Sequence, residues 1–153
     1  MKIKSINFPD ELMRAIRREE LVVFAGAGIS MGAPAKLPDF SGLTRKIAME
    51  TGEEKPDLEP DDRFLGQLHK KGHKVHLLAA KALYTAPGSA TPLHHDLLRL
   101  FKSTSKVRIV TTNFDLLFEE ASIRVFDETT DVYISPALFG TRFYRYHSYT
   151  WQP

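Results

Sequence analysis

The pattern of apolar and polar residues predicts a helix near the start of the chain. Leu12, Met13 and Ile16 have the spacing of one helix face, and Pro9 favours a helix start just before them. The helix is expected to end at about Glu19.

Short, continuous apolar runs interrupt the helical spacing and predict strands. Residues 21–25 are expected to form a strand buried on both faces, and residues 107–111 a second buried strand. Residues 132–134 predict a third, short strand. Helices are expected over residues 43–49, 63–84, 92–101 and 116–125. Strands separated by helices favour an α/β fold with a parallel sheet.

The segments between these elements differ in composition. Residues 26–42 hold four glycines and two prolines, which is typical of a loop, and residues 53–62 are acidic and predict an exposed linker. After Ser135 the chain is rich in aromatic residues without any apolar period. We assign residues 1–153 to a single, incomplete domain in which residues 141–153 form an atypical tail.

The first candidate site follows the first predicted strand. Residues 26–30 read Gly-Ala-Gly-Ile-Ser, and glycines at the carboxyl end of a strand let the backbone turn tightly and approach a pyrophosphate. The usual dinucleotide-binding fingerprint has a third glycine where this chain has Met31. From the spacing alone, a plain structural turn remains an alternative.

The second candidate site follows the second predicted strand. Asn113 and Asp115 stand where ligands bind in open α/β sheets, outside the carboxyl ends of the strands. The alternative is a helix cap, in which Asn113 caps a helix that begins near Phe114 and the helix dipole favours Asp115.

The third candidate site is an acid beside an aromatic residue in the glycine-rich loop. Asp39 and Phe40 follow Leu37 and Pro38. An exposed aromatic side chain in a loop can clamp a flat ring, whereas in the alternative interpretation Phe40 anchors the loop in the core.

The composition excludes several classes of function. The 153 residues include no cysteine, which removes a thiolate nucleophile, a disulfide framework and a cysteine zinc site. The formal charge of +2 does not favour direct nucleic-acid binding. The chain shows neither a signal peptide nor an apolar run long enough for a membrane span, so we expect a cytoplasmic protein.

The histidines are expected to have structural roles. His69, His73 and His76 are spaced to share one face of a predicted helix, but no carboxylate joins them, so a solvated or half-buried face is favoured over a metal site. No metal is therefore assigned. His94 and His95, at the start of their helix, are expected to pack and cap.

Together, the three candidate segments resemble the sirtuin family. Gly-Ala-Gly-Ile-Ser at 26–30, Pro-Asp-Phe at 38–40 and Thr-Thr-Asn-Phe-Asp at 111–115 occur in that order, and residues 90–101 are similar to the helix that precedes the Asn strand. The sequence looks closest to the sirtuin-like NAD+ hydrolase domains of bacterial anti-phage defence proteins. The resemblance covers roughly residues 7–140.

The resemblance implies a Rossmann-like parallel sheet with flanking helices, and an activity that cleaves NAD+ to nicotinamide and ADP-ribose. NAD+ is then a substrate, and no zinc is expected. By resemblance, Asn113 is the catalytic residue that positions the attacking water, while Asp115 and Phe40 hold the nicotinamide. The residues that the resemblance assigns to NAD+ binding are Gly26, Ala27, Gly28, Ser30, Asp39, Phe40, Thr112, Asn113 and Asp115.

The resemblance also implies a biological setting. In the defence proteins, NAD+ is depleted when a phage is sensed, and a further domain or a partner chain does the sensing. This sequence carries no such sensor domain, so a sensor domain or partner protein outside this chain is expected, and a homo-oligomer is compatible with the family.

Several residues depart from the family pattern. Deacetylating sirtuins have Gln at Thr112, Arg at Ser41 and a four-cysteine zinc module, so the departures favour hydrolysis over protein deacetylation. The family's catalytic His-Gly pair is absent, and His147 is a poor match to it. Two alternatives therefore stay open: a module that binds NAD+ or ADP-ribose without turnover, and a truncated or frame-shifted fragment.

Overall fold

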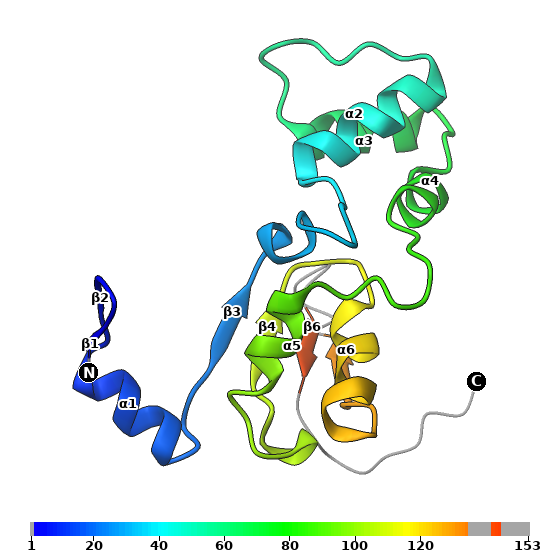
Figure 1. The fold of residues 1–153 in the computed structure, drawn as a ribbon. Helices are drawn as coiled ribbons and strands as arrows, with labels where there is room; N and C mark the ends of the chain where they lie inside the picture. Colours follow the sequence, from blue (N-terminus) through cyan, green and yellow to red (C-terminus); the bar gives the residue numbers. More distant parts are fainter. Residues whose placement is uncertain (1, 135–141, 145–153) are drawn as a thin grey trace.

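The computed structural model describes residues 2–134 and 142–144, and Figure 1 shows their arrangement. Three helices, α2, α3 and α4, gather into one part, and α5 and α6 lie beside the strands β3, β4 and β6 in the other. The first three elements form an N-terminal arm, which consists of β1 (Lys2–Ile3), β2 (Ile6–Asn7) and α1 (Asp10–Arg17). The remaining elements are β3 (Val23–Ala25), the 3-10 helix η1 (Ala27–Ser30), α2 (Phe40–Thr51), α3 (Asp61–Lys70), α4 (Val75–Ala82), α5 (Pro92–Leu98), the 3-10 helix η2 (Thr104–Lys106), β4 (Ile109–Thr111), α6 (Leu117–Phe126), β5 (Val132–Ile134) and β6 (Arg142–Tyr144).

The larger sheet has the strand order β3-β4-β6-β5. β3 and β4 are parallel, with Val23 opposite Ile109, whereas β6 runs antiparallel to both β4 and β5. The three strands expected from the sequence therefore point the same way, but the prediction of a wholly parallel sheet is wrong. β6, which the apolar pattern did not predict, lies between two of them. The fold is mixed α/β with one parallel strand pair.

Helices cover one face of this sheet in the described part of the chain. The larger core joins alternate residues of β3 and β4, such as Ala25 and Ile109, to buried residues of α5 and α6. Phe24, which lies between Val23 and Ala25 in β3, is 80% exposed. The prediction that residues 21–25 are buried on both faces is therefore wrong, because no described helix covers the other face.

The second core lies among α2, α3 and α4. Its buried residues are Leu43, Ile47, Ala48, Phe64, Leu68 and Val75. α2 begins three residues before the predicted start, because the Asp39 carboxylate accepts a hydrogen bond from the Gly42 N–H at 2.7 Å and caps the helix. It ends, as expected, at Gly52, whose φ of 68° is left-handed.

The single helical stretch expected over residues 63–84 is two helices, α3 and α4. Gly72, with φ of 94°, lies between them and breaks the helical backbone. The break also separates the three histidines that were expected on one helix face. His69 belongs to α3 and His76 to α4, with their ring centres 5.8 Å apart, and His73 lies in the connection.

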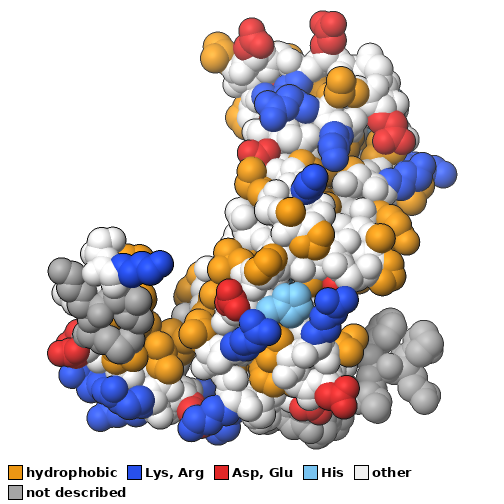
Figure 2. Space-filling view, viewed as in Figure 1, with side chains coloured by type: hydrophobic (Ala, Val, Ile, Leu, Met, Phe, Trp, Pro, Cys, Tyr) orange, Lys and Arg blue, Asp and Glu red, His pale blue; other side chains and the backbone are white. Residues whose placement is uncertain are grey.

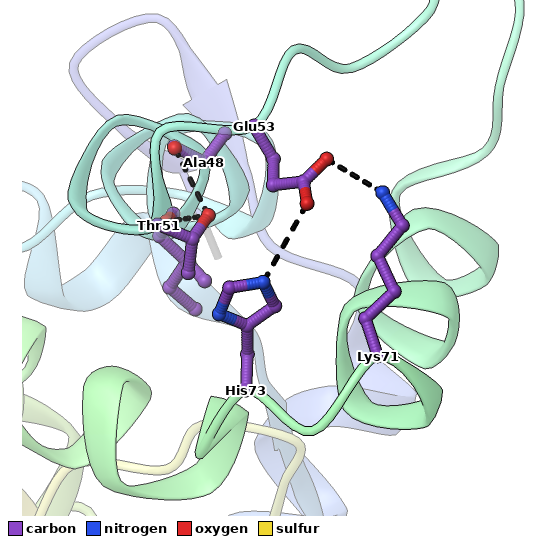
Figure 3. Close-up of polar contacts among 6 residues, drawn as sticks. Ala48, Thr51, Glu53, Lys71 and His73 are labelled. Carbon is purple, nitrogen blue, oxygen red and sulfur yellow. Dashed lines mark hydrogen bonds and ion pairs between the residues drawn. The ribbon is translucent and has the colours of Figure 1, made fainter.

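One carboxylate ties the end of α2 to this break. Glu53 contacts Lys71 at 2.6 Å and His73 at 3.6 Å (Figure 3). The hydrogen bond from Lys71 holds the pKa of Glu53 below its usual value. Among the described residues, no group of three or more histidine, aspartate or glutamate side chains is placed to hold a metal ion.

Two further predicted helices begin close to where they were expected, although α5 ends at Leu98, three residues before the predicted end. α5 begins at Pro92 directly after its N-cap Thr91, and α6 begins one residue after the predicted start. No helix in the described ranges is long and apolar enough to cross a membrane.

Candidate functional site

The three candidate segments meet at one pocket of about 240 Å³ between the two parts of the fold. One wall, which comes from the end of β4 and the 3-10 helix η1, is polar, and the other is mainly apolar and includes Leu43 of α2 and Leu83 after α4. The lining residues are Ala27, Ser30, Leu37, Pro38, Asp39, Phe40, Leu43, Leu83, Thr112, Asn113, Phe114 and Asp115. Of the residues assigned to NAD+ binding from the sequence, only Gly26 and Gly28 lie outside this lining.

Ser30 is the centre of the polar wall. Its side chain is buried, and the hydroxyl donates to Oδ2 of Asp115 at 2.8 Å. The same oxygen accepts from Nδ2 of Asn113 at 3.3 Å and lies 3.4 Å from Nε2 of His94. Four side chains from η1, α5 and the end of β4 are thus joined through one hydroxyl group.

Asn113 connects this network to the glycine-rich segment. Its Nδ2 donates to the main-chain oxygen of Gly26 at 3.2 Å, and its backbone N–H donates to Oγ1 of Thr111 at 3.0 Å. A carbonyl oxygen only accepts, so this contact fixes which side-chain atom of Asn113 is nitrogen. The other atom, Oδ1, is buried and has no hydrogen-bond partner. The alternative role of Asn113 as a helix cap is wrong, because α6 begins only at Leu117.

Asp115, and not Asn113, accepts a hydrogen bond from the backbone at the start of α6. Its Oδ1 accepts from the Leu117 N–H at 3.2 Å, in the first turn of α6, while Oδ2 holds Ser30. The carboxylate is buried at the pocket wall. A negative charge at this end of α6 is favoured by the exposed N–H groups of a helix start.

His94 is a member of the network that sequence reasoning did not assign to the site. It is fully buried, packs edge-on against Phe118 and, as expected for a capping role, accepts from the Thr91 N–H at Nδ1. Because a backbone N–H can only donate, Nδ1 of neutral His94 is the acceptor and its proton is on Nε2, facing Ser30. Burial lowers the pKa of His94, and the charge of Asp115 partly opposes that shift.

The sequence predicts only one of the two contacts of His94. Thr91 and His94 stand three residues apart, the spacing of a capping box in which the third residue reaches back to the N-cap N–H. That spacing predicts the Nδ1 contact. The contact with Ser30 joins residues 64 apart, and no local pattern reports it.

Asp39, Phe40 and Thr112 stand at the edges of the pocket. Phe40 is 45% exposed, so the alternative in which it anchors the loop in the core is wrong. Asp39 lines the pocket while its Oδ1 caps α2, and Thr112 is exposed beside Asn113. His147 lies outside the described residues.

The glycines of the first segment leave open space beside the pocket. A Cβ atom placed on Gly26 or Gly28 would meet no other atom within 4 Å, and both residues are exposed. Neither glycine is required by packing within the described protein. The room beside this backbone would admit a ligand group, as glycines at a strand end do in dinucleotide-binding proteins.

The hydrogen bonds limit the chemistry of the polar wall. Ser30 donates its proton to the Asp115 carboxylate and faces the N–H of a neutral imidazole, so His94 offers no lone pair to take that proton as in a serine–histidine nucleophile. Among the described lining residues there is no cationic side chain, and Asp39 and Asp115 are acidic. The wall therefore favours a neutral or cationic group that carries hydrogen-bond donors.

Comparison with known proteins gives one relative and no family. No family model and no solved structure matches the chain. Over 126 residues the chain is 32% identical to a protein of Sinorhizobium fredii (strain NBRC 101917 / NGR234) named "Uncharacterized protein y4cA". This match covers 75% of the chain and 10% of that protein. The chain thus spans about a tenth of the length of its relative, whose name assigns no activity.

Proposed function

We propose that this chain binds NAD+ at the pocket and hydrolyses it to nicotinamide and ADP-ribose. The observation that carries the proposal is the unpaired Oδ1 of Asn113, buried at a wall to which all three sirtuin-like segments contribute. A buried acceptor without a partner costs about 1–3 kcal/mol, which a ligand hydroxyl or a water molecule would offset. Among the described residues that line the pocket, the buried atom without a partner therefore belongs to the residue that the resemblance makes catalytic.

The size of the pocket suits part of a dinucleotide. Its volume of about 240 Å³ lies below the range of ~300–1,000 Å³ that is typical for whole small ligands. We assign it to the nicotinamide and its ribose, with the pyrophosphate beside the open backbone of Gly26 and Gly28. The parallel β3–β4 pair that positions these groups supports a Rossmann-like interpretation of the sheet.

Each wall then has a role in the reaction. The exposed ring of Phe40 packs against the cationic pyridinium, and Asp115 accepts from the carboxamide N–H. The bond from the ribose anomeric carbon to nitrogen breaks with its electron pair on nitrogen, so nicotinamide leaves neutral. Oδ1 of Asn113 holds a water whose oxygen bonds to that carbon, and the water's proton passes to solvent.

A second candidate function, binding of NAD+ or ADP-ribose without turnover, has an observation of its own. The one histidine of the polar network presents its N–H, and not a lone pair, to Ser30. The described pocket therefore offers no imidazole base for the attacking water. A role in anti-phage defence, with a sensor partner, rests on the sirtuin likeness alone.

Nicotinamide release by the purified chain tests the proposal, with Asn113→Ala as the variant. We expect a loss of about 100-fold or more in the variant, because a displaced water removes the aligned geometry. The chain's other asparagine, Asn7, is exposed in β2, so Asn7→Ala is the matched control and should keep full activity.

The melting temperature in NAD+ separates the remaining outcomes. Stabilisation by NAD+ without nicotinamide release supports binding without turnover. A chain that neither releases nicotinamide nor gains stability from NAD+ contradicts both candidates.

A further inference from the structure

A cavity of about 350 Å³ lies near the start of β3, between α1 and the connection from α5 to β4. Its described lining residues do not overlap with those of the candidate site, which lies at the carboxyl end of the same strand. The volume falls within the range of ~300–1,000 Å³ that is typical for small-molecule pockets. The cavity is therefore large enough for a ligand of its own.

The floor of this cavity is apolar and mainly aliphatic. Phe101 is a buried residue of the larger core, and Leu21 packs against that core. Ile16 of α1 and Leu100 also line the cavity, and Leu100 is 40% exposed. A chain of methylene groups in the cavity would cover these side chains, and such burial of apolar surface is favourable.

The charged residues that line the cavity give it a positive character. Lys102 and Lys106 contact the carboxylate of Glu19 at 2.7 Å and 2.9 Å, and their hydrogen bonds lower the pKa of Glu19 from 4.5 to about 2. Glu19 therefore stays charged and holds both lysines beside the cavity. Arg17, the third cation in the described lining, is exposed and makes no ion pair with any described residue. Three cations against one acid favour an anionic group on the ligand.

Contacts at Glu19 join the two sides of the cavity. Its φ of 61° is left-handed, which a non-glycine residue adopts where its surroundings hold it. The Arg108 side chain donates to the main-chain oxygen of Glu19, in addition to the two lysine contacts with its carboxylate. The turn between α1 and β3 is thus attached to the connection that leads into β4. Figure 2 shows lysine and arginine side chains gathered over α1, with hydrophobic side chains between α1 and the rest of the molecule.

We propose that this cavity binds an aliphatic chain with a carboxylate head group, as in a fatty acid. The chain lies against Ile16, Leu21 and Leu100, which suit a flexible aliphatic chain better than a flat ring. The carboxylate pairs with Arg17, whose planar guanidinium matches the two carboxylate oxygens. Each lysine keeps further N–H donors after its contact with Glu19 and adds to the positive field at the head group.

Calorimetric titration of the purified chain with saturated fatty acids tests the proposal. Decanoate should bind, and each loss of two carbons, to octanoate and then to hexanoate, should weaken binding by about tenfold, because two methylene groups fewer are buried. Decanol has the same chain length without the charge and should bind about fivefold more weakly than decanoate. High salt should weaken the binding of decanoate and leave that of decanol unchanged.

Two arginine variants test the place of the head group. Arg17→Gln should weaken the binding of decanoate by about fivefold and leave its dependence on chain length intact. Arg45→Gln changes another exposed helical arginine, in α2, that has no ion pair within the described residues, so it should bind decanoate like the wild type. Because both side chains are exposed, both variants should keep the melting temperature of the wild type.

Three results would overturn the proposal. They are an affinity that does not change with chain length, decanol that binds as tightly as decanoate, and Arg17→Gln that binds decanoate like Arg45→Gln. Binding to vesicles of phosphatidylglycerol without any binding of free decanoate would also overturn it, in favour of a membrane surface. These readouts use neither NAD+ nor nicotinamide, so they stand apart from the test of the proposed function.

Discussion

Nδ2 of Asn113 donates to the main-chain oxygen of Gly26 across 87 residues of sequence, at 3.2 Å. The contact joins the carboxyl ends of β3 and β4, the parallel pair of the sheet. It fixes the orientation of the amide, so that Oδ1 is the atom left without a partner. The same residue therefore links the two strand ends and has one buried acceptor without a partner.

Removal of the Ser30 hydroxyl should destabilise the fold. Ser30→Ala leaves Asn113, Asp115 and His94 each without one buried contact, so we expect a loss of about 1–3 kcal/mol in the free energy of unfolding, measured in denaturant. Ser5→Ala, at an exposed turn, should change it by less than about 0.5 kcal/mol. Equal stability of the two variants would contradict the buried network.

Buried His94 should make the fold sensitive to mild acid. Burial lowers its pKa from 6.5, so the unfolded chain binds a proton at a pH where the folded chain does not. This contribution to stability is fully present above pH 6.5 and is lost as the pH falls toward the folded pKa. In melts between pH 8 and pH 5, His94→Gln should be less stable at the high end and show a shallower fall. A parallel pH profile in the variant would rule out this origin.

Glu19 should give a second loss of stability at lower pH. Hydrogen bonds from Lys102 and Lys106 lower its pKa from 4.5 to about 2. The folded state then binds the proton less readily than the unfolded state, so the stabilisation is present above pH 4.5 and is lost as the pH falls toward 2. Glu19→Gln should remove this part of the acid transition, and high salt should weaken it in the wild type. A salt-independent transition would argue against the ion pairs.

Two glycines in and after α3 should respond to alanine in opposite ways. Gly72 has a left-handed φ of 94°, so Gly72→Ala should cost about 1 kcal/mol of stability. Gly66 lies inside α3 with open space around it, so Gly66→Ala should add about 0.5–1 kcal/mol. Thermal unfolding of both variants measures the difference. A stabilising Gly72→Ala would show that α3 and α4 are not broken there.

The local sequence predicted the elements that carry the site. Glycines after one apolar run and Asn-Phe-Asp after another correctly placed polar groups at neighbouring strand ends, because carboxyl ends of parallel strands meet. Gly72 also indicated the break between α3 and α4. The helical spacing of the surrounding apolar residues nevertheless led to the prediction of a single helix. Asp39 as an N-cap was likewise readable from its type and its place before α2.

Other features depend on contacts that no local pattern reports. An apolar run does not say whether its strand lies at the centre or at an edge, so Phe24 was expected to be buried. The place of β6 between β4 and β5 depends on which segments pair, and the link from His94 to Ser30 depends on how α5 packs against η1. The hydrolase activity stays a prediction until nicotinamide release is measured.

Leu83 packs against both hydrophobic cores and also lines the pocket. The two walls of the pocket therefore come from two cores that meet at Leu83, and a molecule bound between them would contact both. Binding at such a junction depends on how the two cores pack against each other. Substitutions in the second core, far from every polar group of the site, would then weaken a ligand by loosening the frame that holds it.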